Sequence, residues 1–339
     1  SPNDCEVFCD CPRCSEANLG RKPQGAERRA SPYWVTRSVF EFANRVAERV
    51  GREFPDKLVV VIAYSRTKSP PRNLRIRDNV LVWYCDQPQD NWQGAAGRAQ
   101  MDREIAQWTR IARHVGVFDY VVNQSWPGLT RPITGLLAHE LQHLHRCGGR
   151  YYYTQHAEDF GVNLPNYHLL ATLLWDVRRD PAKVLDDFYR RCFRSGAQAV
   201  ERYYDVLAAA IAAAAAPDAG PGTLGITAHR RGHEGVCAVY TPAVMRAAGE
   251  ALRQARRDTA GDPQARRRLR LVEGAFTHLR TAVEAARLTF AFEHRYRIQT
   301  LAPWAWNVGN YDYPSAVEKL QMFGRPCADQ FRGVMEAWR

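Results

Sequence analysis

The sequence of 339 residues predicts an α/β protein in which helices alternate with the strands of a parallel sheet. Three observations support this fold class. Four short apolar runs are rich in β-branched and aromatic residues, two of the stretches between them repeat apolar residues at helical spacing, and Gly or Pro stands near the junctions. A helix between two strands returns the chain to the start of the next strand, so we expect parallel strands.

The first predicted unit is a helix followed by a strand. Between residues 34 and 50, apolar residues recur at near-helical spacing, at Val39, Phe42, Val46 and Val50. The run KLVVVIAY at residues 57–64 follows a Pro-Asp pair and suits a buried strand. A second strand, NVLVWYC at residues 79–85, is reached through a loop with two adjacent prolines that is too broken for a good helix.

The next two units each pair a helix with a strand. One helix is marked by apolar residues at Met101, Ile105, Trp108, Ala112 and Val115. Gly116 closes this helix, and VFDYVV at residues 117–122 is the third predicted strand. A further helix over residues 133–147 ends at two glycines, and RYYYT at residues 150–154 is the fourth strand.

Beyond about residue 155 the sequence predicts helices alone. A loop rich in Gly and Pro at residues 217–225 precedes two long helices, expected over about residues 242–259 and 263–290. The predicted organisation is therefore a β/α region over residues 1–200 and an α-helical C-terminal region over residues 201–339. Trp175 is expected in the core, because it lies on a helix with leucines at helical spacing.

Composition limits the partners that the chain can have. The formal net charge of +11 comes mostly from arginines spread along the whole sequence, without a basic tail, which predicts no nucleic-acid partner. No apolar stretch approaches the length of a membrane-spanning helix, so no membrane span is expected. The sequence starts at Ser1 without an initiator methionine or a secretion-signal pattern, which indicates a processed product or a fragment.

Four of the nine cysteines crowd into the first 14 residues. Thiolates at such spacings can hold a structural zinc ion, whereas in an oxidising compartment they pair as disulfides, and both alternatives stay open. A catalytic role is not predicted, because no histidine partner is apparent near the cysteines. The four residues are Cys5, Cys9, Cys11 and Cys14.

The sequence also contains the HExxH pattern, as His139, Glu140 and His143. On a helix, this pattern offers two imidazoles to zinc, with the glutamate as general base of a metalloprotease. Such an enzyme needs a third ligand, yet the next carboxylate is Glu158, which lies beyond a predicted strand. We therefore expect a solvated helix face, and the zinc metalloprotease is the third-ranked functional hypothesis.

Several phrases, in this order and spacing, resemble a large bacterial family of domains of unknown function that is grouped with glycoside-hydrolase TIM barrels. The family is often likened to alpha-glucuronidases and hexosaminidases, and the resemblance covers about residues 1–215. The phrases are SPND, CDCPRC, PDKLVVVIAY, PPRNLRIRDNVLVWYC, VFDYVV, LPNYHLLATLLWDVRRDPAKVLDDFYRRCF and GAQAVERYYDVL.

The resemblance implies a TIM-type β/α barrel of which this chain holds the second half. In the family, the element equivalent to SPND lies at the end of a middle barrel strand, so the N-terminal half of the barrel is expected elsewhere in the full protein. The resemblance further implies a glycoside-hydrolase-like protein that acts on an oligo- or polysaccharide and is secreted or periplasmic. No cofactor is expected for catalysis.

Hydrolysis of a glycosidic bond requires two carboxyl groups, one protonated and one ionised, at the carboxyl ends of barrel strands. Asp4, in the element that resembles the family, and Glu158, after the fourth strand, are the favoured pair. Asp86 and Asp159 are further candidates. Hexosaminidases carry an Asp-Glu pair where this chain has Asn3 and Asp4, which argues against their substrate-assisted mechanism.

Sugar sites also need flat apolar platforms beside polar groups. The candidates at or near the predicted strand ends are Tyr64, Trp83, Tyr84, Tyr120, Trp126 and Tyr153, with the polar Gln155. Tyrosines in strands can equally be barrel packing. Two alternatives to hydrolysis therefore stay open, a glycan-binding barrel module without catalysis and an inactive fragment.

Overall fold

A computed structural model describes residues 35–64, 67–85, 94–121, 129–155, 161–214 and 228–296 of the chain. These residues form two compact units. The sheet unit takes in the described residues up to 85, together with Ala95–Val121 and His139–Gln155. The helical unit takes in the described residues between 129 and 138 and those from 161 onward.

The sheet unit is built on four parallel strands that neighbour one another in chain order. The strands are β1 (Val59–Ala63), β2 (Val80–Cys85), β3 (His114–Asp119) and β4 (Tyr151–Thr154). The predicted α/β class and its four strands are confirmed. β3 begins three residues before the predicted start, because Val115 and Val117 alternate into the core of a strand instead of closing the preceding helix.

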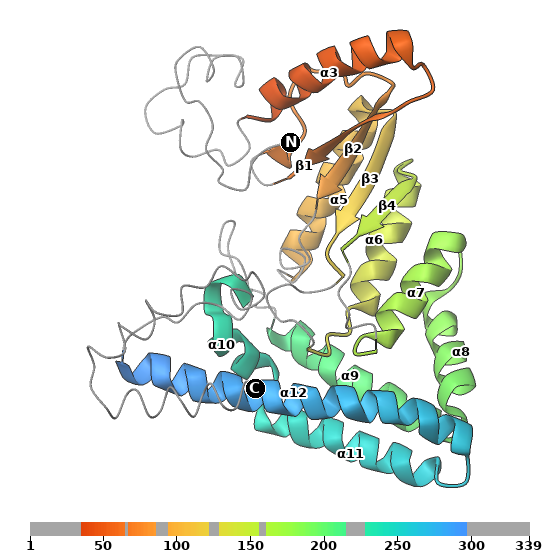
Figure 1. Cartoon of the computed structure of the whole chain (residues 1–339), viewed down its shortest axis with the longest axis vertical. Helices are drawn as coiled ribbons and strands as arrows, with labels where there is room; N and C mark the ends of the chain where they lie inside the picture. The colour runs from red at the N-terminus through yellow and green to blue at the C-terminus, as the bar shows by residue number, and fades with distance from the viewer. Residues whose placement is uncertain are drawn as a thin grey trace. The chain divides into compact units, whose positions relative to one another are not determined.

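Three helices cover one face of this sheet: α3 (Thr36–Glu53), α5 (Gly94–Ile111) and α6 (Thr134–Arg146), of which the His139–Arg146 part belongs to the sheet unit (Figure 1). Alternate residues of each strand point toward these helices and form one core with them. The core combines Phe40, Ala43 and Ala47 from α3, Met101, Ile105 and Trp108 from α5, Leu144 from α6, and Val61, Ala63, Val80, Val82, Tyr84, Val115 and Val117 from the strands.

The helical unit contains the remaining described helices. Two of them start at prolines whose preceding residue caps the helix, with Asp180 accepting from the Ala182 N–H and Thr241 from the Val244 N–H. The helices are α7 (Leu164–Trp175), α8 (Pro181–Phe193), α9 (Ala197–Ala214), α10 (Ala228–Val239), α11 (Pro242–Asp258) and α12 (Pro263–Tyr296), with a short 3₁₀ turn η2 (Arg194–Gly196). The two long helices that we predicted, α11 and α12, are confirmed.

Trp175 corrects one prediction about this unit. It is the last residue of α7 and is 93% exposed, whereas Leu169, Leu170 and Leu173 are buried. The helix turns 100° per residue, so Trp175 lies off the buried stripe although leucines surround it in sequence. None of the helices that the structure describes is long and apolar enough to cross a membrane.

Candidate functional site

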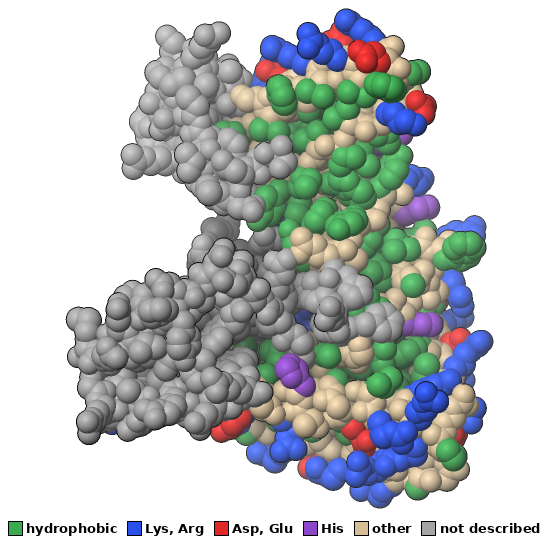
Figure 2. Space-filling view, in the orientation of Figure 1, with side chains coloured by type: hydrophobic (Ala, Val, Ile, Leu, Met, Phe, Trp, Pro, Cys, Tyr) green, Lys and Arg blue, Asp and Glu red, His purple; other side chains and the backbone are tan. Residues whose placement is uncertain are grey.

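The face of the sheet opposite the helices carries a continuous group of aromatic side chains, which we call the aromatic face. Trp83 of β2 packs edge-on against Tyr151 and Tyr153 of β4, with ring centroids 6.5 and 6.2 Å apart. The ring centroid of Phe118 on β3 lies 4.7 Å from that of Tyr153 and 5.5 Å from that of Tyr120. The five rings therefore form one connected surface across three strands, and Figure 2 shows hydrophobic side chains gathered over the strands.

A glycine at the centre of the aromatic face allows this arrangement. Gly116 lies directly between Trp83 and Tyr151 in the register of the sheet. A Cβ atom at this position would lie 2.6 Å from Cζ3 of Trp83 and 2.6 Å from Cβ of Tyr151. The missing side chain therefore lets the indole of Trp83 approach β3 closely.

The aromatic face is only partly covered. Tyr153 is 50% exposed, and Val60 on β1 is 52% exposed. Trp83, Phe118 and Tyr151 are half-buried. The OH group of Tyr151 lies 3.1 Å from Nδ1 of His114 at the amino-terminal end of β3. A polar pair thus lies at the amino-terminal edge of the aromatic face.

The predicted platform residues divide between the two faces. Trp83, Tyr120 and Tyr153 belong to the aromatic face, and their role in sugar binding stays a prediction. Tyr64 directly follows β1, and its main-chain N–H donates to Oγ1 of Thr67. Tyr84 differs from expectation, because strand alternation turns it toward the helices and buries it completely.

Two buried carboxylates that the sequence analysis missed lie on the helix-covered side of the sheet. Asp119, the last residue of β3, accepts from the Tyr152 OH at 2.6 Å and from the Tyr120 N–H at 2.6 Å. The main-chain carbonyl of Asp119 accepts from the N–H of the predicted site residue Gln155 at 3.0 Å. The signal for Asp119 was present, since an acidic residue interrupts the apolar run VFDYVV.

The other buried carboxylate is Glu104 of α5. Its oxygens accept from the Ser69 hydroxyl at 2.5 Å and from the Tyr84 OH at 2.8 Å. The Lys68 ammonium lies 5.4 Å from the centre of the Tyr84 ring. These contacts explain why Tyr84 is buried, since its phenol OH is satisfied by a carboxylate within the core.

Asp119 and the glutamate of the HExxH pattern, Glu140, both act on the ionisation of Tyr152. Burial raises the pKa of Tyr152 well above its ordinary value, and the negative charges of Asp119 and Glu140 raise this pKa further. Glu140 is itself buried. Glu140 therefore does not belong to the expected solvated helix face but to the buried polar groups between α6 and the sheet.

The two histidines of the pattern contact α5. Nε2 of His139 lies 2.9 Å from Oδ1 of Asp102, and Nε2 of His143 lies 3.0 Å from the Asp102 carbonyl oxygen. Sγ of Cys147 lies 3.3 Å from Nε2 of His143. The expected solvated face is thus a contact between two helices. Among the described residues, no group of three or more His, Cys, Asp or Glu side chains is arranged to hold a metal ion.

The remaining predicted site residues lie outside the described part of the chain and stay predictions. They are Asp4, Cys5, Cys9, Cys11, Cys14, Asp86, Trp126, Glu158 and Asp159.

The described site defines an α/β protein whose parallel sheet is covered by helices on one face and carries aromatic rings on the other. The chain belongs to the DUF4838 family, a domain of unknown function, whose model matches residues 1–205. The match covers all four strands and continues into α9. No curated protein and no solved structure matches the chain.

Proposed function

We propose that the chain is a carbohydrate-active protein of glycoside-hydrolase type that binds an oligo- or polysaccharide. The observation that carries this proposal is the aromatic face, with five connected rings of which Tyr153 is half exposed. The C–H faces of pyranose rings are apolar and flat, so they stack on aromatic rings while their hydroxyls reach neighbouring polar groups.

The proposed framework is a TIM-type β/α barrel whose remaining strands come from another part of the full protein. Two features support it: the strands follow one another in chain order, and the helices lie on one face. Right-handed crossovers between sequential parallel strands place every helix on the same side, as in a barrel. Parallel sheets are rarely left open on one face, so the remaining barrel strands would cover the amino-terminal part of the aromatic face. The rings at the carboxyl ends of the strands, such as Tyr120 and Tyr153, would stay at the sugar site.

The proposed reaction uses Asp4 and Glu158. One carboxylic acid protonates the glycosidic oxygen, and the other carboxylate acts as nucleophile or activates a water molecule. This chemistry requires no cofactor, so the metal or disulfides proposed at Cys5, Cys9, Cys11 and Cys14 would be structural. A secreted or periplasmic location is part of the same proposal, since a protein in these locations can reach polysaccharides outside the cytoplasm.

Glycan binding without hydrolysis is the second candidate function. It is favoured by one observation: Asp119 and Glu104, the buried carboxylates described above, lie on the side of the helices and are held by tyrosine hydroxyls. Neither faces the aromatic rings, so the aromatic face could bind a sugar while these two carboxylates offer it no catalytic acid or base.

The test separates the two functions. The unaltered chain and Glu158→Gln are compared for binding and for hydrolysis of a panel of oligosaccharides. The variant should bind normally and lose hydrolysis. Trp83→Ala should weaken binding about tenfold, the effect of losing one aromatic stacking contact. Phe42→Ala is the matched control, since Phe42 is an exposed aromatic residue on α3.

Hydrolysis by the unaltered chain that survives Glu158→Gln would exclude the proposed mechanism. Binding with no hydrolysis in any variant would establish the binding module. If Trp83→Ala and Phe42→Ala changed binding equally, the aromatic face would not be the site.

A further inference from the structure

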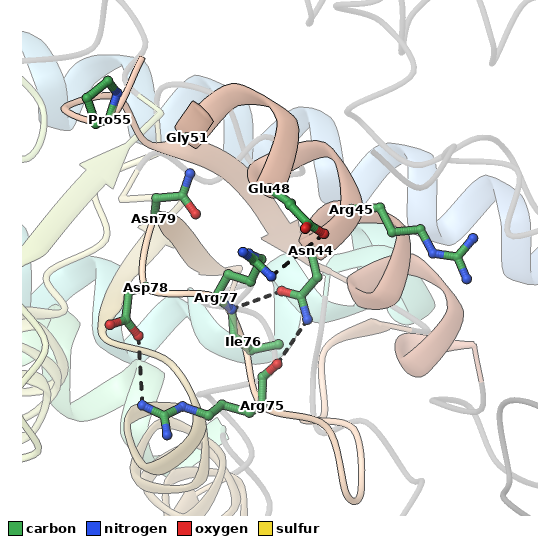
Figure 3. Close-up of a pocket in the computed structure, with 10 residues that line it drawn as sticks. All are labelled: Asn44, Arg45, Glu48, Gly51, Pro55, Arg75, Ile76, Arg77, Asp78 and Asn79. Carbon is green, nitrogen blue, oxygen red and sulfur yellow. Dashed lines mark hydrogen bonds and ion pairs between the residues drawn. The ribbon is translucent and has the colours of Figure 1, made fainter. Parts of the chain in front are cut away.

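The sheet unit contains an open pocket at the amino-terminal end of β2, the end of the strand opposite the predicted carboxylates. Its volume is about 660 Å³, within the range of small-molecule sites. One wall is a stripe of α3, and the other is the segment that leads into β2 (Figure 3). The lining residues are Asn44, Arg45, Glu48, Gly51 and Pro55, then Arg75, Ile76, Arg77, Asp78 and Asn79.

Hydrogen bonds fix the two walls of this pocket to each other. The Asn44 amide donates to the Arg75 carbonyl and accepts from the Arg77 N–H, both at 2.9 Å. The Asn79 amide donates to the Ala47 carbonyl of α3 at 2.8 Å. Ile76 between them is buried. The pocket is therefore formed before any ligand arrives, which lowers the entropic cost of binding.

A glycine keeps the pocket open on the helix side. A Cβ atom at Gly51 would lie 3.1 Å from Nδ2 of Asn79. Any larger side chain would fill the space between α3 and the segment before β2. This position in the last turn of α3 is thus occupied by a residue that costs helix stability and leaves room.

The charges around the pocket do not balance. Glu48 is shared by Arg52, at 2.9 Å, and Arg77, at 3.8 Å. Asp78 is shared by Arg75, at 3.9 Å, and Arg113, at 3.8 Å. Three of these four distances exceed hydrogen-bonding length, so the guanidinium groups keep N–H donors that the carboxylates do not satisfy. The pocket lining itself contains three arginines and two carboxylates, which leaves an excess positive charge.

We infer that this pocket binds a small anionic molecule that carries phosphate or clustered carboxylate groups. Arg75 and Arg77 supply planar pairs of N–H donors that match the oxygens of both groups. The Arg45 side chain extends away from these two arginines (Figure 3), so the inference rests on Arg75 and Arg77. The inference is independent of the proposed carbohydrate function, since it rests on a different end of the strands and on different residues.

The test measures binding of inorganic pyrophosphate, citrate and uncharged glucose to the full chain by calorimetry. Pyrophosphate or citrate should bind with a dissociation constant between about 10 μM and 1 mM, and glucose should not bind at this pocket. Because the arginines are exposed, raising NaCl from about 50 to 500 mM should weaken anion binding severalfold. Comparison of the two anions shows whether phosphate or carboxylate is the preferred group.

Three variants make the test specific. Arg75→Ala combined with Arg77→Ala should weaken anion binding at least tenfold. Asp78→Asn should strengthen it severalfold, a gain that misfolding cannot produce. Arg178→Ala combined with Arg179→Ala removes the same charge from exposed positions before α8 and should leave binding unchanged. Equal losses in the two double variants, no gain with Asp78→Asn, or no anion binding at all would overturn the inference.

Discussion

The two faces of the sheet differ in what covers them and in the residues that they carry. On the helix-covered face the strands place valines, an alanine and the buried Tyr84 against three helices. On the aromatic face the same strands place rings that are half-buried or exposed. Both sets come from one alternating sequence, since successive side chains of a strand point to opposite faces.

Under the proposed function, this difference would separate the roles of stability and binding within the same strands. The helix-covered face buries aliphatic surface and closes its polar groups with internal hydrogen bonds, as Tyr84 does with Glu104. The aromatic face leaves apolar area accessible to another molecule. Substitutions on the first face should therefore reduce the free energy of unfolding, whereas substitutions of the exposed rings on the second should chiefly affect binding under the proposed function.

The largest expected effect is on the helix-covered face. Trp108 is fully buried on α5, packs on Phe40 with ring centroids 4.7 Å apart, and donates its indole N–H to the Lys68 carbonyl at 2.8 Å. Trp108→Ala should lower the free energy of unfolding by about 3–5 kcal/mol, measured by urea denaturation. A loss below about 1 kcal/mol would show that this face is not the main core of the unit.

The second effect tests the close packing around Gly116 on the aromatic face. Gly116→Ala should cost about 2 kcal/mol, because the new Cβ would overlap Trp83 and Tyr151. Gly135→Ala on α6 is the matched control. Nothing lies within 4 Å of its added Cβ, so the helix should gain up to about 1 kcal/mol. Similar values for both variants in thermal denaturation would contradict the tight packing around Gly116.

The third effect adds a dependence on pH. Tyr152→Phe removes the OH that donates to the buried Asp119, which should cost about 2 kcal/mol at neutral pH. The folded-state pKa of Tyr152 is raised above its unfolded value of about 10. The folded chain therefore holds this proton longer, and the stability that it contributes is present below pH about 10 and is lost as the pH rises through the folded-state pKa.

Denaturation of both proteins at neutral pH and above pH about 10 checks this sign. The difference in stability between the unaltered chain and Tyr152→Phe should shrink as the pH rises. A difference that stays constant would mean that Tyr152 titrates normally in the folded state.

The smallest effect belongs to the exposed part of the aromatic face. Tyr153→Ala should reduce the free energy of unfolding by about 1 kcal/mol or less, since half of the side chain already contacts solvent. The same variant should weaken binding of an oligosaccharide under the proposed function. A stability loss equal to that of Trp108→Ala would erase the distinction between the two faces.

The sequence predicted the positions of the four strands well because each strand is a short apolar run bounded by Gly, Pro or a helical segment. It also predicted α6, α11 and α12 within a few residues. The prediction of a solvated face at His139 and His143 failed because the contact that decides it joins residues distant in sequence. Asp102 precedes His139 by 37 positions, and no spacing rule links them.

The other differences concern residues whose place in a helical or strand repeat the sequence does not settle. Val115 fits both the helical repeat before it and the strand alternation after it, and the structure assigns it to β3. Tyr84 and Trp83 are adjacent aromatic residues in one strand, so a sequence alone does not say which faces the helices. The acidic partner Glu104, which decides this, lies on a different element.

The order of the strands has a practical consequence for handling the protein. Among the described strands, β1 pairs with β2 alone and β4 pairs with β3 alone, so the outer backbone edges of the sheet are not closed by a further described strand. β1 reads VVVIA, a sequence with high β propensity and no charge. An edge of this kind is a template for strands of other molecules, so concentrated or warm preparations of the chain should aggregate through β1 first.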